Sequence, residues 1–302
     1  MKPIDRGVLG VPLTRRTFLS LSGATLLAAA LPVEGLDAPL PEPVTGRALK
    51  AVVVRSAPDG AAPMVRHLWP DSTTPLLGLK GGWYAVPDGY VHRYDIQPML
   101  SSAPGDMAHP AALPAWAVVV AAVAPVRRWA SAAAPLVTRI GHGGVLAVVD
   151  ALPGDDGGWY ALSEHPDSTP LGWTPATRWS ICTEPEPART TRARRLLLDR
   201  ARAAIIAQED GRDVLRLSAA VPPRMRAGRP GTGGGLLRQP ATRINPWYGA
   251  AWVLSGNGML LYGVYWHHRF GETGEGPGWE VAPWAARWLY GWLPVDASIE
   301  VI

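Results

Sequence analysis

Short runs of apolar residues, separated by clusters of glycine, proline and aspartate, recur along most of the chain. Such runs are typical of β-strands joined by turns. One segment departs from this pattern, because Trp284, Trp288, Leu289 and Trp292 recur at helical spacing directly after Pro283. Proline suits the first turn of a helix, and this spacing gives one apolar face. The pattern therefore predicts a mainly β protein with a helix near 283–292 that packs on a sheet.

One sequence unit occurs twice. The first copy contains Ala-Pro-Met-Val at 62–65 and Gly-Gly-Trp-Tyr-Ala at 81–85. The second contains Ala-Pro-Leu-Val at 134–137 and Gly-Gly-Trp-Tyr-Ala at 157–161. Matching order and similar spacing indicate an internal repeat, and short strands with tight turns are typical of small barrels. The pattern resembles bacterial SH3-like domains, a resemblance that implies modules which bind or orient on the cell wall.

The N-terminus has the features of an export signal. Arg15-Arg16 precede Phe18-Leu19, and an apolar stretch runs from Leu19 to Leu31. Paired arginines at this position resemble the twin-arginine motif, which implies an extracytoplasmic protein. The apolar stretch is shorter than the ~20 residues of a membrane-spanning helix, so we expect cleavage and no stable transmembrane anchor. The resulting organisation is a signal peptide at 1–38, a Pro-rich linker at 39–47, SH3-like domains at 48–100 and 115–184, a linker at 101–114, and a third domain at 190–302.

Composition supports the β prediction and limits the chemistry. The 302 residues include 33 Gly and 31 Pro, an amount of turn-forming residues that argues against a helical bundle. A single cysteine, Cys182, excludes an intramolecular disulfide and a cysteine-based zinc or iron–sulfur site. It leaves open one nucleophilic thiol. No histidine lies near Cys182 in the sequence, so we interpret it as an inert, buried side chain.

Basic charge is concentrated in one segment. Residues 185–243 contain 13 Arg against five acidic residues, whereas the formal net charge of the whole chain is +4. An anionic wall polymer or a membrane surface is one possible partner for such a segment, and a solvated basic face without a ligand is the other interpretation. No aromatic-interleaved nucleic-acid motif accompanies the arginines, so no nucleic-acid partner is expected.

The C-terminal third carries a family resemblance. The stretch Tyr265–Gly271 reads Tyr-Trp-His-x-x-Phe-Gly, and it is followed by the predicted helix. Together these residues resemble the catalytic domain of YkuD-type L,D-transpeptidases over roughly 190–302. The resemblance implies a β-domain in which a cysteine thiolate attacks a peptide carbonyl of the wall stem peptide and passes the acyl group to a neighbouring amine.

The family's catalytic motif is degenerate in this chain. Counting without a gap from Gly271 places Glu275 where the family has the serine of Ser-His-Gly-Cys. Gly276 then takes the place of the histidine, and Gly278 that of the cysteine. Glu280 replaces the arginine or asparagine that follows, and Tyr262 replaces an upstream histidine. Glycine has no side chain that can ionise or attack, so nucleophile and general base are both missing.

Three further groups of residues are candidates for binding. The first group would line a residual pocket and consists of Tyr265, Trp266, His267 and Trp279. The second would stack on a wall ligand, or else fill the barrel interiors, and consists of Trp83, Trp159 and Trp173. The third would form an acidic lip, or else a solvated loop, and consists of Glu272, Glu275 and Glu280. We expect no metal at His267-His268 and no cofactor.

Three functions remain open on this basis. The leading hypothesis is an exported, catalytically inactive L,D-transpeptidase homologue that binds or scaffolds peptidoglycan, or modulates an active paralogue. The second is a working acyltransferase with an unrecognised nucleophile. The third is a structural envelope protein whose former active-site cleft is filled, for example by Trp279.

Overall fold

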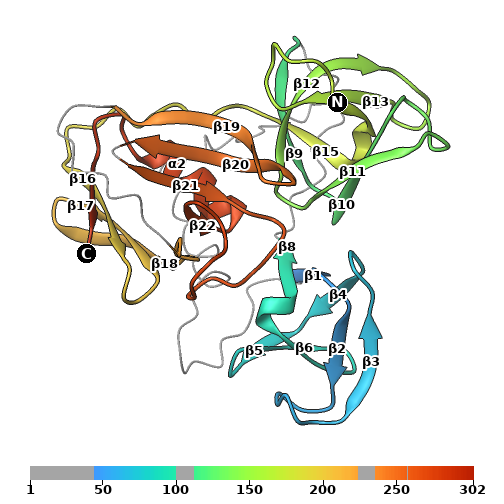
Figure 1. The fold of residues 1–302 in the computed structure, drawn as a ribbon, viewed down its shortest axis with the longest axis horizontal. Coiled ribbons are helices and arrows are strands. Elements are labelled where there is room, and N and C mark those ends of the chain that lie inside the picture. The colour runs from blue at the N-terminus through green and yellow to red at the C-terminus, as the bar shows by residue number, and fades with distance from the viewer. Residues whose placement is uncertain (1–43, 100–111, 224–234, 257) are drawn as a thin grey trace, which may run out of the picture.

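The computed structural model describes residues 44–99, 112–223, 235–256 and 258–302 (Figure 1). The prediction of a mainly β fold is confirmed, with one α-helix among these residues. The expected signal peptide, most of the 101–114 linker and most of the Gly-rich 228–235 segment lie outside the described residues. Within the part that is described, no helix is long and apolar enough to cross a membrane.

Residues 44–99 form the first module, drawn in blue to cyan in Figure 1. Its strands make a five-stranded sheet of order β3-β2-β7-β6-β5 and a three-stranded sheet of order β4-β1-β8. The expected linker at 39–47 is wrong at its C-terminal end, because residues 44–47 belong to a strand that pairs with both β4 and β8. The elements of this module are β1 (Val44–Ala48), β2 (Val52–Arg55), β3 (Met64–Leu68), β4 (Thr73–Leu76), β5 (Gly78–Lys80), β6 (Trp83–Val86), β7 (Gly89–His92), the 3₁₀ helix η1 (Arg93–Asp95) and β8 (Ile96–Met99).

Residues 115–182 form the second module, a seven-stranded sheet of order β11-β10-β14-β13-β12-β9-β15. The two modules repeat one contact. Arg55 donates to the Ala62 carbonyl oxygen at 2.7 Å, and Arg127 donates to the Ala134 carbonyl oxygen at 2.6 Å. The elements of this module are β9 (Ala115–Val119), β10 (Val123–Arg127), β11 (Leu136–Gly141), β12 (Val145–Leu152), β13 (Trp159–Ser163), β14 (Gly172–Pro175), the 3₁₀ helix η2 (Ala176–Arg178) and β15 (Trp179–Cys182).

The C-terminal part contains two four-stranded sheets, of order β18-β17-β16-β23 and β19-β20-β21-β22. Strands β16 and β17 form an antiparallel hairpin with a short turn. The helix α2 lies against β20 and β21. The elements of this part are β16 (Arg194–Asp199), β17 (Ala204–Glu209), β18 (Arg212–Ser218), β19 (Leu237–Ile244), β20 (Trp247–Gly256), β21 (Met259–Gly263), β22 (Trp279–Val281), α2 (Pro283–Trp292) and β23 (Ser298–Val301).

The helix has the expected bounds, and of the predicted apolar stripe only Leu289 is fully buried. Its fully buried residues include Ala285, Ala286, Leu289 and Tyr290, so the small residues allow close approach to the sheet. The tryptophans of the predicted stripe, Trp284, Trp288 and Trp292, are only partly buried at its margin. Trp288 and Trp292 stack on each other with ring centroids 5.2 Å apart. Spacing alone predicted the helix, whereas the size of the side chains decided which face enters the core.

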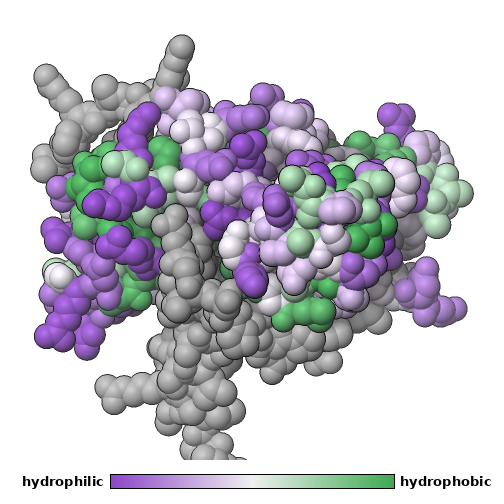
Figure 2. All heavy atoms as spheres, turned by 90° about the horizontal axis from the view of Figure 1, so that it is seen from below, coloured by the Kyte–Doolittle hydropathy of each residue, from purple (hydrophilic) through white to green (hydrophobic). Residues whose placement is uncertain are grey.

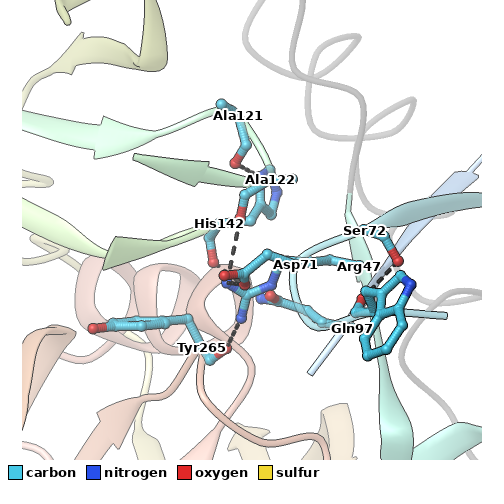
Figure 3. A network of polar contacts seen from close by, with 9 residues as sticks. Arg47, Asp71, Ser72, Gln97, Ala121, Ala122, His142 and Tyr265 are labelled. Carbon is cyan, nitrogen blue, oxygen red and sulfur yellow. Dashed lines mark hydrogen bonds and ion pairs between the residues drawn. The ribbon is translucent and has the colours of Figure 1, made fainter. Parts of the chain in front are cut away.

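The three parts of the chain meet around one buried arginine (Figure 3). Arg47 on β1 is 4% exposed. Its guanidinium donates to the Ala122 carbonyl oxygen of the second module at 3.3 Å and to the Tyr265 carbonyl oxygen of the C-terminal part. Within the first module it pairs with Asp71 at 3.4 Å. Burial lowers the pKa of this guanidinium, and Asp71 opposes that effect. Arg47 therefore joins both modules to the segment that precedes His267.

Four of the ten described arginines of the basic segment form ion pairs with acidic residues of the same segment. Arg192 and Arg194 both pair with Glu209, each with an N–O distance of 2.9 Å. The pairs Arg202–Asp199 and Arg216–Asp213 lie at 3.0 and 3.3 Å. Hydrophilic side chains surround apolar ones at the left of Figure 2, the end that carries this sheet. These pairs compensate part of the segment's positive charge, and the other described arginines of the segment form no ion pair among the described residues.

Candidate functional site

The candidate site is centred on a buried carboxylate. Glu280, in β22, is 2% exposed. Strand β22 runs parallel to β21 with Glu280 opposite Tyr262, and the Tyr262 hydroxyl donates to Glu280 Oε1 at 3.0 Å. Burial raises the pKa of Tyr262, and the adjacent Glu280 carboxylate raises it further, so the phenol keeps its proton and acts as a donor. Tyr262 and Glu280, two positions that the sequence analysis singled out, therefore hydrogen-bond to each other.

A histidine completes this cluster. His267 Nε2 lies 2.9 Å from Glu280 Oε2, and its Nδ1 accepts the backbone N–H of Arg269 at 3.2 Å. Because Nδ1 is an acceptor, the proton of the neutral imidazole is on Nε2, which donates to the carboxylate. Both ring nitrogens are thus engaged within the protein. In this arrangement His267 positions the loop and offers no free nitrogen to act as a general base.

The acidic lip expected from three glutamates is wrong for Glu280. Its carboxylate points into the protein, where it accepts from the tyrosine and histidine described above. Glu272 pairs with Arg269 at 3.0 Å, and Glu275 is exposed. The three carboxylates therefore do not share one surface, and only Glu275 and Glu272 lie on the loop as solvent-facing charges.

The glycines at the nucleophile and base positions lie in close contact with their surroundings. A Cβ atom built on Gly278 would overlap the carbonyl oxygen of Leu260. One built on Gly276 would overlap Glu280 Oε1 and the Tyr262 hydroxyl. The backbone of Gly278 also approaches that hydroxyl. A side chain at Gly278 would force a shift of backbone, whereas at Gly276 the atoms in the way are the ends of two side chains.

The expected pocket-lining residues are divided between the core and the surface. Trp279 is 1% exposed and belongs to the main core cluster, so it fills the core and does not line a pocket. Tyr265 is buried and donates its hydroxyl to the Tyr248 carbonyl oxygen at 2.6 Å. Trp266 is half-buried and stacks on Trp247. Sequence inspection did not single out Trp247. Its position depends on the turn between β19 and β20, which brings its ring against Trp266, 19 residues further along the chain.

The tryptophans expected to stack on a wall ligand lie on β6, β13 and β14. Trp83, Trp159 and Trp173 are all half-buried. This degree of burial does not decide whether they fill the barrel interiors or stack on a ligand. Trp83 has a protein partner, because its ring meets His92 edge-on at a centroid distance of 5.0 Å. Wall-ligand stacking by these three residues stays a prediction.

The lone thiol lies at the end of the second module. Cys182 on β15 pairs with Trp116 on β9 and packs against the main core cluster. Burial raises the pKa of Cys182 to about 11, against an opposing effect of Arg287. A thiol with this pKa is almost entirely protonated at neutral pH, and the thiolate is the nucleophilic form.

This pKa predicts slow alkylation of Cys182. Raising a thiol pKa from 9.0 to about 11 lowers the thiolate fraction at pH 8 by about 100-fold. We expect iodoacetamide to label the native protein about 100-fold more slowly than a model thiol, and to reach the model rate in urea. The rate in the native state should rise with pH toward pH 11. Rapid labelling at pH 7 would instead identify Cys182 as an activated nucleophile.

Among the residues that the structure describes, no group of three or more His, Cys, Asp or Glu side chains is arranged to hold a metal ion. Next to His267, burial lowers the pKa of His268 to about 3. The His268 imidazole is therefore neutral over the physiological pH range. The arrangement around Glu280 is a closed hydrogen-bonded cluster in which each carboxyl oxygen has one partner.

Searches of known structures return L,D-transpeptidases. The structure is similar to an L,D-transpeptidase from Mycobacterium tuberculosis H37Rv, with 12% identity, a TM-score of 0.32, and coverage of 43% of this chain and 64% of that one. For an L,D-transpeptidase from Mycobacterium smegmatis the identity is 14%, the TM-score 0.31 and the coverage 61% and 99%. NlpC2 from Trichomonas vaginalis gives 12% identity, a TM-score of 0.18 and coverage of 50% and 52%.

The chain thus spans somewhat less than two thirds of the first of these proteins. No protein-family model and no curated protein matches the sequence. At these identities and TM-scores the likeness assigns no activity to this chain, so the functional argument rests on its own residues.

Proposed function

We propose that this protein is an exported, catalytically inactive L,D-transpeptidase-like protein that binds or scaffolds peptidoglycan in the cell envelope. The observation that carries the proposal is the packing at Gly278, where a Cβ atom would overlap the Leu260 carbonyl oxygen. The position that the family resemblance gives to the nucleophile has lost its thiol and also the space for one. This packing supports the proposal that no cysteine acyl transfer takes place at this position.

The base position supports the same conclusion. Gly276 lies against the Glu280 carboxylate and the Tyr262 hydroxyl, which fill the space that an imidazole side chain would need. His267, the nearest imidazole in this cluster, donates to the same carboxylate. The Glu280 carboxyl group thus has one hydrogen-bond partner on each of its oxygens, and both partners are residues of the protein.

We expect Gly278→Cys to destabilise the protein without creating activity. Inserting a side chain against backbone forces a local shift, with an expected cost of about 2 kcal/mol. Gly78→Cys is the matched control, because a Cβ atom at Gly78 meets nothing within 4 Å. Urea unfolding should separate the two variants, and incubation with disaccharide-tetrapeptide muropeptides should show no D-alanine release by either. A stable Gly278→Cys variant that releases D-alanine would show that the site retains room for catalysis.

Binding to the wall is tested separately by co-sedimentation. We expect the protein without residues 1–38 to pellet with purified sacculi and to stay in the supernatant without them. A protein that stays in the supernatant at all sacculus concentrations would leave only the role of a structural envelope protein. Export stays a prediction from residues 1–38, which lie outside the described residues, and cell fractionation of an Arg15→Lys, Arg16→Lys variant tests it.

A further inference from the structure

The end of the β19–β20 hairpin presents an exposed tryptophan on a rigid support. Trp247 is 45% exposed. Its ring lies nearly parallel to that of Trp266, with an angle of 7° and a centroid distance of 5.8 Å. Trp266 comes directly before His267, so the exposed ring lies beside the Glu280 cluster. One face of Trp247 is therefore occupied by a protein partner while much of the ring meets solvent.

The support beneath this ring is fixed by several contacts. Trp266 meets the Tyr265 ring edge-on at 5.1 Å, and the Tyr265 hydroxyl donates to the Tyr248 carbonyl oxygen at 2.6 Å. The Tyr265 carbonyl oxygen in turn accepts from Arg47. Trp266 also packs against the core cluster of the second module and against the cluster around Tyr262. Because Trp266 is fixed and Trp247 stacks on it, the Trp247 ring loses little conformational entropy when a ligand stacks on it.

The surroundings of Trp247 are polar. Asn245 and Pro246 are exposed beside it, and no apolar core cluster includes Trp247. The one charged side chain in residues 242–250 is Arg243. It is exposed, its guanidinium lies 4.5 Å from the centre of the Tyr248 ring, and no ion pair among the described residues includes it. The exposed indole thus lies beside the half-buried rings of Trp266 and Tyr248 and is bordered by hydrogen-bonding and cationic groups.

An exposed indole with polar and cationic neighbours favours one class of ligand. A protein partner generally buries a contiguous apolar patch of several hundred Å², which a single indole does not provide. A pyranose ring is flat, has an apolar C–H face of one ring's width, and carries hydroxyl groups at its edge. Indole is suited to such amphipathic contacts. The positive charge of Arg243 favours a sugar that bears a carboxylate.

We infer that Trp247, supported by Trp266, is a binding site for a pyranose of a glycan strand, with Arg243 favouring sugars that carry a carboxylate. This inference deepens the proposed function and rests on it, since it assigns wall binding to the glycan and not to the stem peptide. The site lies on the C-terminal part and is separate from the half-buried tryptophans of the two modules.

The test uses two glycan probes and three variants. The probes are a neutral tetramer of N-acetylglucosamine and peptide-free wall glycan, which carries carboxylates on its muramic acid residues. We expect Trp247→Ala to weaken binding of both probes about tenfold or more in calorimetric titration, equivalent to the loss of about 1.4 kcal/mol. Trp247→Phe should restore most of the affinity. Arg243→Gln should weaken binding of the carboxylate-bearing glycan alone, by about fivefold.

Trp69→Ala is the matched control, because Trp69 is 73% exposed on the first module and makes no aromatic stack among the described residues. It should bind both probes like the native protein. Unchanged affinity of Trp247→Ala, or no binding of either glycan by the native protein, would overturn the inference. Co-sedimentation with intact sacculi separates that failure from failure of the proposed function. A native protein that pellets with sacculi but binds no free glycan contradicts only the glycan site.

Discussion

Replacing Arg47 by alanine is expected to lower the free energy of unfolding by about 3 kcal/mol and to loosen the contact between the first module and the rest of the chain. The Arg47 side chain is 5% exposed, so solvent screening weakens its contacts little. The substitution would leave the carbonyl oxygens of Ala122 and Tyr265 without this donor, in a region with little access to water. Calorimetry should show a lower melting temperature, and small-angle scattering a larger radius of gyration.

One neighbouring contact limits the expected loosening. The Gln97 amide donates to the His142 carbonyl oxygen at 3.0 Å and would still join the two modules. The matched control is Arg66→Ala, which removes a solvent-exposed pair with Asp88 inside the first module. Exposed pairs contribute at most about 1 kcal/mol, so this variant should unfold nearly as the native protein does. An Arg47→Ala protein with the native melting temperature and radius of gyration would show that Arg47 does not hold the modules together.

Removing the carboxylate of Glu280 is the second substitution with a large expected effect. Glu280→Ala leaves the Tyr262 hydroxyl and His267 Nε2–H without their acceptor and opens a cavity beneath the loop that contains Gly276. Two unsatisfied donors and a cavity together should cost about 3 kcal/mol or more. Urea unfolding followed by tryptophan fluorescence would measure this change.

Two further variants separate the hydrogen bonds from the loss of volume. In Glu280→Gln the amide oxygen accepts from His267 while the amide N–H donates to the Tyr262 oxygen, so the cost should fall to about 1 kcal/mol. Glu275→Ala on the same loop removes an exposed carboxylate and should change stability by less than about 0.5 kcal/mol. If Glu280→Ala were as stable as Glu275→Ala, the buried cluster would not be what holds the loop in place.

Local pattern was sufficient to predict the main elements of this fold. Turn-forming residues between apolar runs predicted strands, and the spacing after Pro283 predicted α2 with its bounds. Counting along the motif led to the prediction that Gly276 and Gly278 replace catalytic residues, and this stays a prediction. Strands, turns and helices depend on residues that are close together in the sequence, so they can be predicted from local patterns.

The features that define the site depend on distant neighbours. Arg47 lies in a stretch that composition assigned to a linker, yet it contacts Tyr265, 218 residues further along the chain. Glu280 looked like part of a solvated loop, and only the parallel pairing of β21 with β22 shows that Tyr262 faces it. Charged residues are seldom buried without partners, so burial of these two could not be predicted before their partners were known.

The most direct test of the account is the release of D-alanine from disaccharide-tetrapeptide muropeptides. The protein without residues 1–38 would be incubated with these muropeptides beside an active L,D-transpeptidase as positive control, and the products followed by mass spectrometry. Because the nucleophile position at Gly278 has no room for a side chain, we predict neither free D-alanine nor 3→3 dimers above the enzyme-free blank. Turnover by the native protein would contradict the account, and its loss in Cys182→Ala would identify the nucleophile.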